Sequence, residues 1–224
     1  MRLIFYVTLL CLSSTAVAQD APLIPTLFEW PERQSDVIGD LRIRDDVSDA
    51  RESARQATTR ASEGRRAVGQ AKRRAGLQGS FGIKPERATL GGDTEVALTR
   101  GRSNGATLGT ITYSTGAIMT GAFGPNVGVY FAEPESPLRQ FSGWVWGAGS
   151  PTPRPMDGIF EWKNGDIFTG SITGDASASK GVYVKADGQF RFVGVIDLSQ
   201  SQFRPIRGYL EGASGKLLAV VRQD

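Results

Sequence analysis

The residues of this 224-residue chain that could do chemistry are few, because it has no histidine and only one cysteine, Cys11. Cys11 lies in an apolar N-terminal run, Leu3–Leu12. The rest of the chain therefore cannot build a histidine-based triad, a cysteine nucleophile, or a zinc site with nitrogen and sulfur ligands. Carboxylate, lysine, tyrosine and hydroxyl chemistry remains. We expect no metal and no cofactor.

Three carboxylates come closest to a catalytic pattern: Glu161, paired with either Asp166 or Asp187. A glycoside hydrolase needs two carboxyl groups facing one cleft, roughly 5 to 10 Å apart. Asp166 and Asp187 lie in or beside turn sequences, where aspartate is favoured for backbone reasons alone. We therefore expect no catalytic residues and no enzyme, and keep a carboxylate-dependent hydrolase as the alternative.

The N-terminus has the pattern of a secretory signal peptide, residues 1–18. A basic residue, Arg2, precedes the apolar run, and small residues from Ser13 to Ala18 follow it. This order predicts cleavage after Ala18 and a periplasmic or secreted protein. The apolar run is about half the roughly 20 residues of a membrane-spanning helix, so an uncleaved anchor is the weaker alternative. The mature chain has no thiol, and its stability must come from its core rather than from disulfides.

The net charge is small. The whole chain carries 26 basic and 23 acidic residues, a net charge of +3, and loss of the leader removes Arg2 and leaves +2. Nucleic-acid-binding domains are expected to show a pronounced basic footprint. We do not expect a nucleic-acid partner.

Residues 19–34 form an arm with prolines at Pro22, Pro25 and Pro31. Proline restricts itself and the residue before it, so the arm should be extended. It is unusually apolar for a free linker, with Leu23, Ile24, Leu27, Phe28 and Trp30. The arm either packs on its own domain or docks on a partner.

Residues 35–76 predict one long helix, since Ser35 to Ala75 contains neither proline nor an aromatic residue. Its small and apolar residues are spaced alternately four and three apart, which is the pattern of a coiled-coil seam. Acidic residues gather early and basic residues late, which suits the helix dipole. Gly76 supplies a stop. The seam consists of Ile43, Val47, Ala50, Ala54, Ala57, Ala61, Gly64, Val68, Ala71 and Ala75.

Alanine dominates this seam, and it buries much less apolar area than leucine, so an isolated two-stranded coil would be weak. Close helix approach or packing along the downstream sheet is favoured, and self-association through the helix stays open. Gly64 and Gly69 each cost about 1 kcal/mol relative to alanine in a helix interior, which leaves a kink or break near residues 64–69 open. The basic residues at the C-terminal end of this helix could contact phosphates or anionic lipid. The simpler interpretation is that they form a solvated charged face. They are Arg65, Arg66, Lys72, Arg73 and Arg74.

Glycine-punctuated strands begin after a transition at residues 77–108, which could hold a degenerate repeat. One recurring element is a glycine followed by a short apolar strand, beginning at Gly109, Gly128, Gly158, Gly181 and Gly208. The other is apolar-x-Gly-x-apolar, centred on Gly121, Gly143, Gly170 and Gly194. Turn sequences separate them, as in Asn164-Gly165 and Asp187-Gly188, which are strong hairpin signals.

Strand alternation puts Phe168, Gly170 and Ile172 on one face, with a notch at the glycine. An aromatic side chain from a neighbouring hairpin, such as Trp162 or Tyr183, could fill this notch. Each unit then needs the next one to bury its apolar face, which is the logic of a repeat array.

The segment Glu161–Gly170 resembles a unit of the MORN repeat family, with its aromatic residue, its Asn-Gly turn and its aromatic-x-Gly strand. Gly181–Ile196 is similar, Gly109–Phe123 and Gly128–Val145 are degenerate copies, and Gly208–Val221 resembles a terminal copy in which Val220 replaces the glycine. The resemblance implies a single-layer antiparallel meander over residues 109–224, in an α+β protein. It also implies an interaction or assembly module rather than an enzyme.

We therefore expect an exported, non-catalytic binding or scaffolding protein that engages a protein or an envelope polymer through a groove of the repeats, through the helix, or through both. The alternatives are a hydrolase acting on envelope polysaccharide and a protein that binds anionic lipid or polymer. Aromatic residues are enriched at interfaces, but a thin sheet also needs them as core. The candidate groove contacts are Trp144, Trp146, Phe160, Trp162 and Tyr183.

Overall fold

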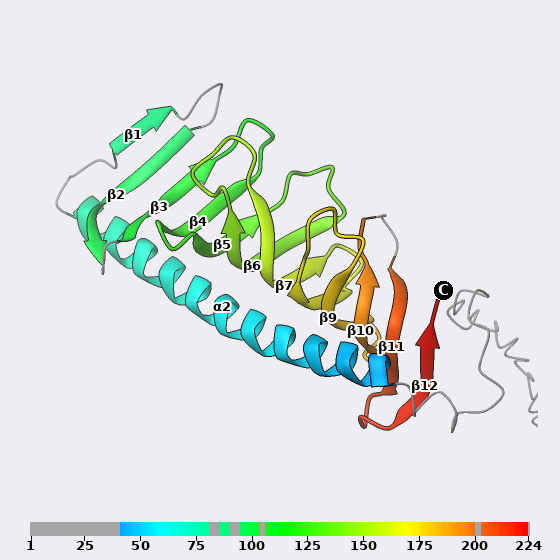
Figure 1. Cartoon of the computed structure of the whole chain (residues 1–224). Helices are drawn as coiled ribbons and strands as arrows, with labels where there is room; N and C mark the ends of the chain where they lie inside the picture. The colour runs from blue at the N-terminus through cyan, green and yellow to red at the C-terminus, as the bar shows by residue number, and fades with distance from the viewer. Residues whose placement is uncertain (1–40, 81–85, 90–94, 104–105, 200–202, 224) are drawn as a thin grey trace, which may run out of the picture.

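The computed structural model describes residues 41–80, 86–89, 95–103, 106–199 and 203–223. One helix, α2 (Leu41–Ser80), is followed by twelve strands (Figure 1). The strands are β1 (Glu86–Thr89), β2 (Glu95–Ser103), β3 (Ala106–Thr112), β4 (Ile118–Phe123), β5 (Val127–Phe131), β6 (Leu138–Trp146), β7 (Arg154–Trp162), β8 (Ile167–Ser171), β9 (Ser179–Val184), β10 (Phe190–Asp197), β11 (Arg204–Gly212) and β12 (Leu217–Arg222). The signal peptide and the arm predicted for residues 1–34 lie outside the described residues.

The strands form a single open sheet in chain order, and each strand is antiparallel to the next. The predicted α+β class and the predicted antiparallel meander are therefore confirmed. Turns join the strands where glycine takes a positive φ, as at Gly116 (86°), Gly165 (90°) and Gly188 (67°). The predicted transition at 77–108 contains the end of α2, strands β1 and β2, and the start of β3.

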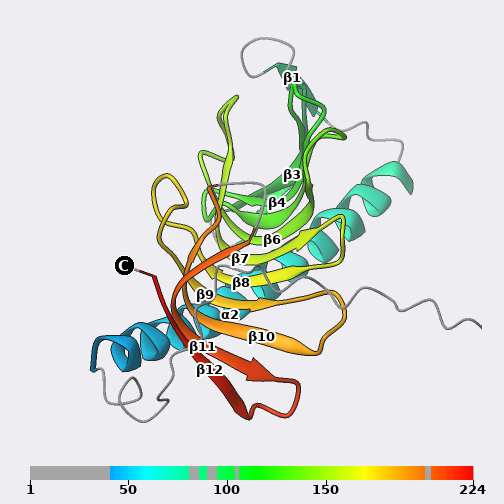
Figure 2. The same ribbon diagram turned by 90° about the vertical axis from the view of Figure 1, so that its right-hand side faces the viewer.

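A row of glycines crosses the sheet at its middle, one on each strand from β3 to β11. The strand register pairs each glycine with the next one along: Gly109, Gly121, Gly128, Gly143, Gly158, Gly170, Gly181, Gly194 and Gly208. A Cβ atom added at Gly170 would lie 2.2 Å from the carbonyl oxygen of Lys180. The missing side chains let every strand bend at the same place. The sheet curls into a trough, seen in Figure 2 as the U-shaped path of the strands.

The terminal copy departs from the predicted alignment. Val221, not Val220, lies opposite Gly208 and occupies the glycine position on β12. Val220 points to the other face and packs against Val47 and Ala50 of the helix.

The inside of the trough is filled by a ladder of side chains from neighbouring strands. The members are 0–7% exposed, and they are Met119, Tyr130, Phe141, Phe160, Phe168, Tyr183 and Phe192. The notch at Gly170 is filled from its own strand rather than from a neighbouring hairpin, because the ring of Phe168 folds back over it. Atoms of that ring lie 2.7 Å and 2.6 Å from the Cβ positions at Gly170 and Gly181. One phenylalanine therefore covers two glycines.

Helix α2 lies beneath the outer face of the trough and contacts strands β2 to β11 (Figure 2). The predicted seam faces this sheet rather than a second helix. Its contact residues are 0–6% exposed: Ile43, Val47, Ala50, Ala57, Ala61, Ala67 and Ala71. Val68 is half-buried and Ala75 is exposed, although both belong to the predicted seam, whereas Ala67, which the predicted seam did not include, is buried. A straight helix has 3.6 residues per turn, so a 3.5-residue seam drifts around its surface.

Gly64 explains why the helix can lie so close to the sheet. A Cβ atom at this position would be 2.6 Å from the carbonyl oxygen of Gly128. The helix runs without interruption through Gly64 and Gly69, so the predicted break does not occur. It also passes Gly76 and ends at Ser80, since Gly76 does not adopt the positive φ that ends a helix.

We predict that Gly64→Ala destabilises the fold, whereas Gly69→Ala does not. Both changes gain about 1 kcal/mol of helix propensity. Only the methyl group at Gly64 meets a carbonyl oxygen, and overpacking of this kind costs about 1–3 kcal/mol. Nothing lies within 4 Å of a Cβ at Gly69. Urea denaturation of the two variants measures the difference, and equal stabilisation by both would contradict the close contact.

Candidate functional site

The predicted groove floor belongs to the core of the trough. Phe160 and Tyr183 are 2% and 5% exposed. Trp162 packs against the same cluster, with its ring centroid 6.2 Å from that of Phe160 and 5.8 Å from that of Tyr183. Phe203 stacks on Tyr183 at 4.0 Å. These rings stabilise the trough, and Phe160 and Tyr183 are too buried to contact a partner.

Trp144 and Trp146 share a strand face, as alternation predicts, but this face is the outer one. Trp144 packs against the cluster that contains Ala67 and Ala71 of the helix. Trp146 is 53% exposed, and the guanidinium carbon of Arg154 lies 5.9 Å from the centroid of its ring. Of the five aromatic candidates, Trp146 is the one that presents a large exposed surface.

Asp166 is a buried carboxylate with a structural set of partners. Its side chain accepts hydrogen bonds from the hydroxyl of Tyr183, from Nδ2 of Asn164 at 3.1 Å and from the backbone N–H of Ala186 at 2.9 Å. The residue is 4% exposed. Asp166 thus fastens the β7–β8 turn to the β9–β10 turn, which stabilises two neighbouring repeats.

The proposed carboxylate pairs do not share a cleft. Glu161 follows Phe160 on β7, so it points to the outer face, where it accepts a hydrogen bond of 2.6 Å from Nε2 of Gln140. Asp166 bonds Tyr183 on the inner face. Asp187 is exposed and accepts from the backbone N–H of Gln189 within its own turn.

Burial raises the pKa of three tyrosines in the trough. The pKa of Tyr183 is raised first by burial and then by the neighbouring Asp166 carboxylate. Burial also raises the pKa of Tyr113, whose hydroxyl donates to the carbonyl oxygen of Ala148 at 2.7 Å. Burial, with Glu133 beside it, raises the pKa of Tyr130 to about 12. All three therefore stay protonated to a higher pH than an ordinary tyrosine does, and each hydroxyl donates a hydrogen bond.

The N-terminal half of α2 is tied to the sheet by ion pairs. Asp46 pairs with Arg207 at 2.8 Å, and Asp49 pairs with Lys180 at 2.7 Å. Glu211, whose side chain is 4% exposed, accepts from Arg51 at 2.8 Å and from Arg191 at 2.6 Å. Asp46, Asp49 and Arg51 of this half therefore hold the helix on β9 and β11.

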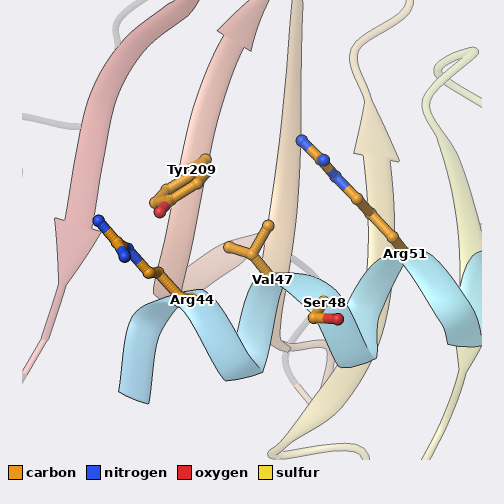
Figure 3. A pocket seen from close by; sticks show the side chains of 5 residues that line it. All are labelled: Arg44, Val47, Ser48, Arg51 and Tyr209. Atoms are coloured by element: carbon orange, nitrogen blue, oxygen red, sulfur yellow. The ribbon is translucent and has the colours of Figure 1, made fainter. Parts of the chain in front are cut away.

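A shallow pocket lies where this half of the helix meets β11 (Figure 3). Arg44, Ser48 and Arg51 line its helix side, Tyr209 lines its sheet side, and Val47 lies between them. In Figure 3 the side chains of Arg44 and Arg51 extend from the helix toward the strands, and Tyr209 lies beside Arg44. One of its two cations, Arg51, is the cation that pairs with Glu211.

The C-terminal half of α2 is different. Arg65, Arg66, Lys72 and Arg73 are exposed, and no ion pair joins them to an acidic residue within the described part of the chain. Arg74 is half-buried, and its Nη1 has no hydrogen-bond partner among the described residues. We call Arg65, Arg66, Lys72 and Arg73 the basic stripe.

Sequence reasoning missed three exposed apolar residues on the outer face, Ile118, Phe131 and Ile167. Strand alternation places Phe131 opposite the face of Tyr130, so the pattern contained this signal once the inner face was known. In the described ranges no group of carboxylates forms a candidate metal site, and no helix is long and apolar enough to cross a membrane.

No family model matches the chain, and no curated protein matches it.

We predict that Asp166→Asn destabilises the protein by about 1–3 kcal/mol, because an amide group replaces one of two acceptor oxygens in a buried site. The matched control is Asp187→Asn, an exposed aspartate of the neighbouring turn, which should change stability by less than about 0.5 kcal/mol. Thermal and urea denaturation measure both. Equal stabilities for the two variants would show that Asp166 does not fasten the turns.

Alkaline pH should weaken the fold, and Tyr183 should contribute. The unfolded chain releases the tyrosine proton near pH 10, whereas the folded chain keeps it, since the folded pKa is raised. Above about pH 10 the folded state therefore binds more protons, and the free energy of unfolding falls as pH rises. Tyr183→Phe should reduce this slope by one proton, about 1.4 kcal/mol per pH unit. Urea titrations between pH 9 and 11.5 test it, and an unchanged slope would refute it.

Proposed function

We propose that this chain is an exported, non-catalytic binding module of MORN-like hairpin repeats, and that it engages an acidic partner through the outward face of α2. The observation that carries the proposal is the basic stripe. Its four cations are exposed, and no acidic residue of the described part pairs with them. An uncompensated group of like charges is a recognition surface for the opposite charge.

The two halves of the helix differ in a way that favours this surface. In the first half, Asp46 and Asp49 pair with cations of the sheet, and Glu52 pairs with Arg55 at 2.9 Å. In the second half, between residues 60 and 74, the sole acidic residue is Glu63, which pairs with Arg60 at 3.4 Å. Positive charge therefore accumulates at one end of a rigid element.

The spacing within the stripe adds geometric definition. Arg65 and Lys72, and likewise Arg66 and Arg73, are seven residues apart, so each pair lies on one side of the helix across two turns. Two turns correspond to about 10 Å. The helix is held by the sheet along its length, so a partner that binds the stripe does not need to order it first.

A binding function is also supported by the interior of the repeats. The glycine row, the Asn164-Gly165 turn and the aromatic ladder agree with the resemblance to MORN repeats. The acceptor oxygens of Asp166 are occupied by structural hydrogen bonds, and Glu161 points to the other face. A groove inside the trough has less support than the helix, because Phe160 and Tyr183 are buried.

Anionic lipid or polymer is the second candidate partner, and the same four cations favour it. Each basic residue near an anionic membrane surface contributes about 1 kcal/mol. The cysteine-free mature chain and the signal-like N-terminus support export to a compartment in which such surfaces occur.

The test compares two variants that remove equal charge. The stripe variant changes four residues to Gln: Arg65, Arg66, Lys72 and Arg73. The control variant changes four exposed cations of turns and strands to Gln: Arg139, Lys163, Lys185 and Lys216. Each lowers the net charge of the whole chain from +3 to −1, since four positive charges are lost. Tagged proteins are captured from the cell envelope, and binding to vesicles of phosphatidylglycerol is measured separately.

We expect the stripe variant alone to lose captured partner by about tenfold or more, because four exposed charge contacts contribute roughly 1–4 kcal/mol. Loss of vesicle binding in the same variant, with no captured protein, would favour the lipid or polymer partner. Equal capture and equal vesicle binding by the wild type and both variants would exclude the stripe as a binding surface.

A further inference from the structure

A continuous row of side chains runs across the outer face of the sheet, beside α2. The register pairs each member with the next, from β4 to β9. We call this row the outer strip, and its members are Ile118, Phe131, Gln140, Glu161, Ile167 and Val184.

The outer strip exposes apolar side chains that the helix does not cover. Ile118, Phe131 and Ile167 are 37%, 46% and 38% exposed, and they are three of the five large apolar side chains that are exposed in the described part of the chain. Ile118 and Phe131 are direct cross-strand neighbours. A row of this kind, rather than scattered residues, indicates a surface that something covers.

We propose that the apolar arm of this same chain, Ala21–Pro31, lies along the outer strip. The exposed apolar members of the strip extend from Ile118 on β4 to Ile167 on β8, four strand spacings or about 19 Å. The apolar residues of the arm extend from Leu23 to Trp30, seven residue steps, or about 22 Å for a proline-rich extended chain. The two lengths match, and the arm brings large apolar side chains to a row whose ends carry the exposed apolar residues Ile118, Phe131 and Ile167, with Gln140 and Glu161 between them.

The connection between the arm and the helix is long enough. Ile43 packs with Val193 of β10 and Val220 of β12, so α2 begins at the β10–β12 end of the sheet. Three strand spacings, about 14 Å, separate β8 from β11. Residues 31–40 can span up to about 33 Å. The arm can therefore turn back beside the helix and meet Ile167 first, then Phe131 and Ile118.

Charge supports the same path. Residues 32–40 contain three acidic residues, Glu32, Asp36 and Asp40, and one basic residue, Arg33. The pocket at the start of α2 is lined by Arg44, Arg51 and Tyr209 (Figure 3). Continued past Val184, the register of the outer strip leads to Arg191 on β10 and Glu211 on β11, and Glu211 pairs with Arg51. A chain that leaves Leu41 toward the strip therefore passes this pocket. The acidic residues of the connection would lie near the cations Arg44 and Arg51, of which Arg51 also pairs with Glu211.

Photo-crosslinking tests the proposal, which does not depend on the proposed function. The photoreactive residue p-benzoylphenylalanine replaces Phe131 in the purified full chain, and the crosslinked peptide is identified by mass spectrometry. The control places the same residue at Trp146, which is similarly exposed on the outer face but is not a member of the strip. A third protein carries the probe at Phe131 together with Leu27→Ser and Phe28→Ser in the arm.

We expect the Phe131 probe to crosslink within its own chain to residues 21–31, and the Trp146 probe not to do so. The two arm substitutions should lower the crosslinking yield about tenfold or more. The free energy gained by burying one such apolar side chain exceeds about 1.4 kcal/mol, which corresponds to a factor of ten in the docking equilibrium. Crosslinks between two chains would overturn the proposal in favour of a second copy. Crosslinks to another protein, the absence of a crosslink to the arm, or a mature chain that begins after residue 31 would also overturn it.

Discussion

The close contact of glycine backbones across nine neighbouring strands is the constraint on which the rest of the structure depends. At Gly121, Gly158 and Gly194, a Cβ atom would lie 2.1–2.3 Å from a carbonyl oxygen of the paired strand. Each strand bends where its side chain is absent, and the bends are in register, so the sheet curves as a whole. The phenylalanine rings then fold over the glycines, which fills the inside of the curve. Curvature and core are two consequences of one row of residues.

The outer face follows from the same curvature. A long helix can lie against the underside of the trough because most of its contact residues are alanine, and Gly64 lies directly against the backbone of Gly128. Alanine buries little apolar area per residue, so ion pairs to β9–β11 and a contact along ten strands hold the helix instead. Those ion pairs use Asp46, Asp49 and Arg51 in its first half. The cations of its second half are thereby left to face the solvent.

The sequence was sufficient for the period of the repeats, the Asn-Gly and Asp-Gly turns and the alanine face of the helix, since these depend on local chemistry. It was not sufficient for the choice of inner face. Alternation puts Trp144 and Phe160 on opposite faces, but either face could have lined a groove until the bend at the glycines was known. The register of β12 was missed by one residue because Val220 and Val221 have the same side chain. Gly64 was interpreted as a possible break, because its contact is with Gly128, on a strand 64 residues away in the chain.

The two features of the outer face would contribute differently to binding. If the arm covers the outer strip, then the apolar surface is used within the chain, and the basic stripe is what an outside partner meets. Exposed charge contacts act over about 8 Å at physiological ionic strength, so they raise the association rate more than they slow dissociation. A complex made chiefly through the stripe would therefore form fast, dissociate fast and weaken steeply as salt is added. Such behaviour suits repeated, short-lived contact with an acidic surface rather than fixation at one site.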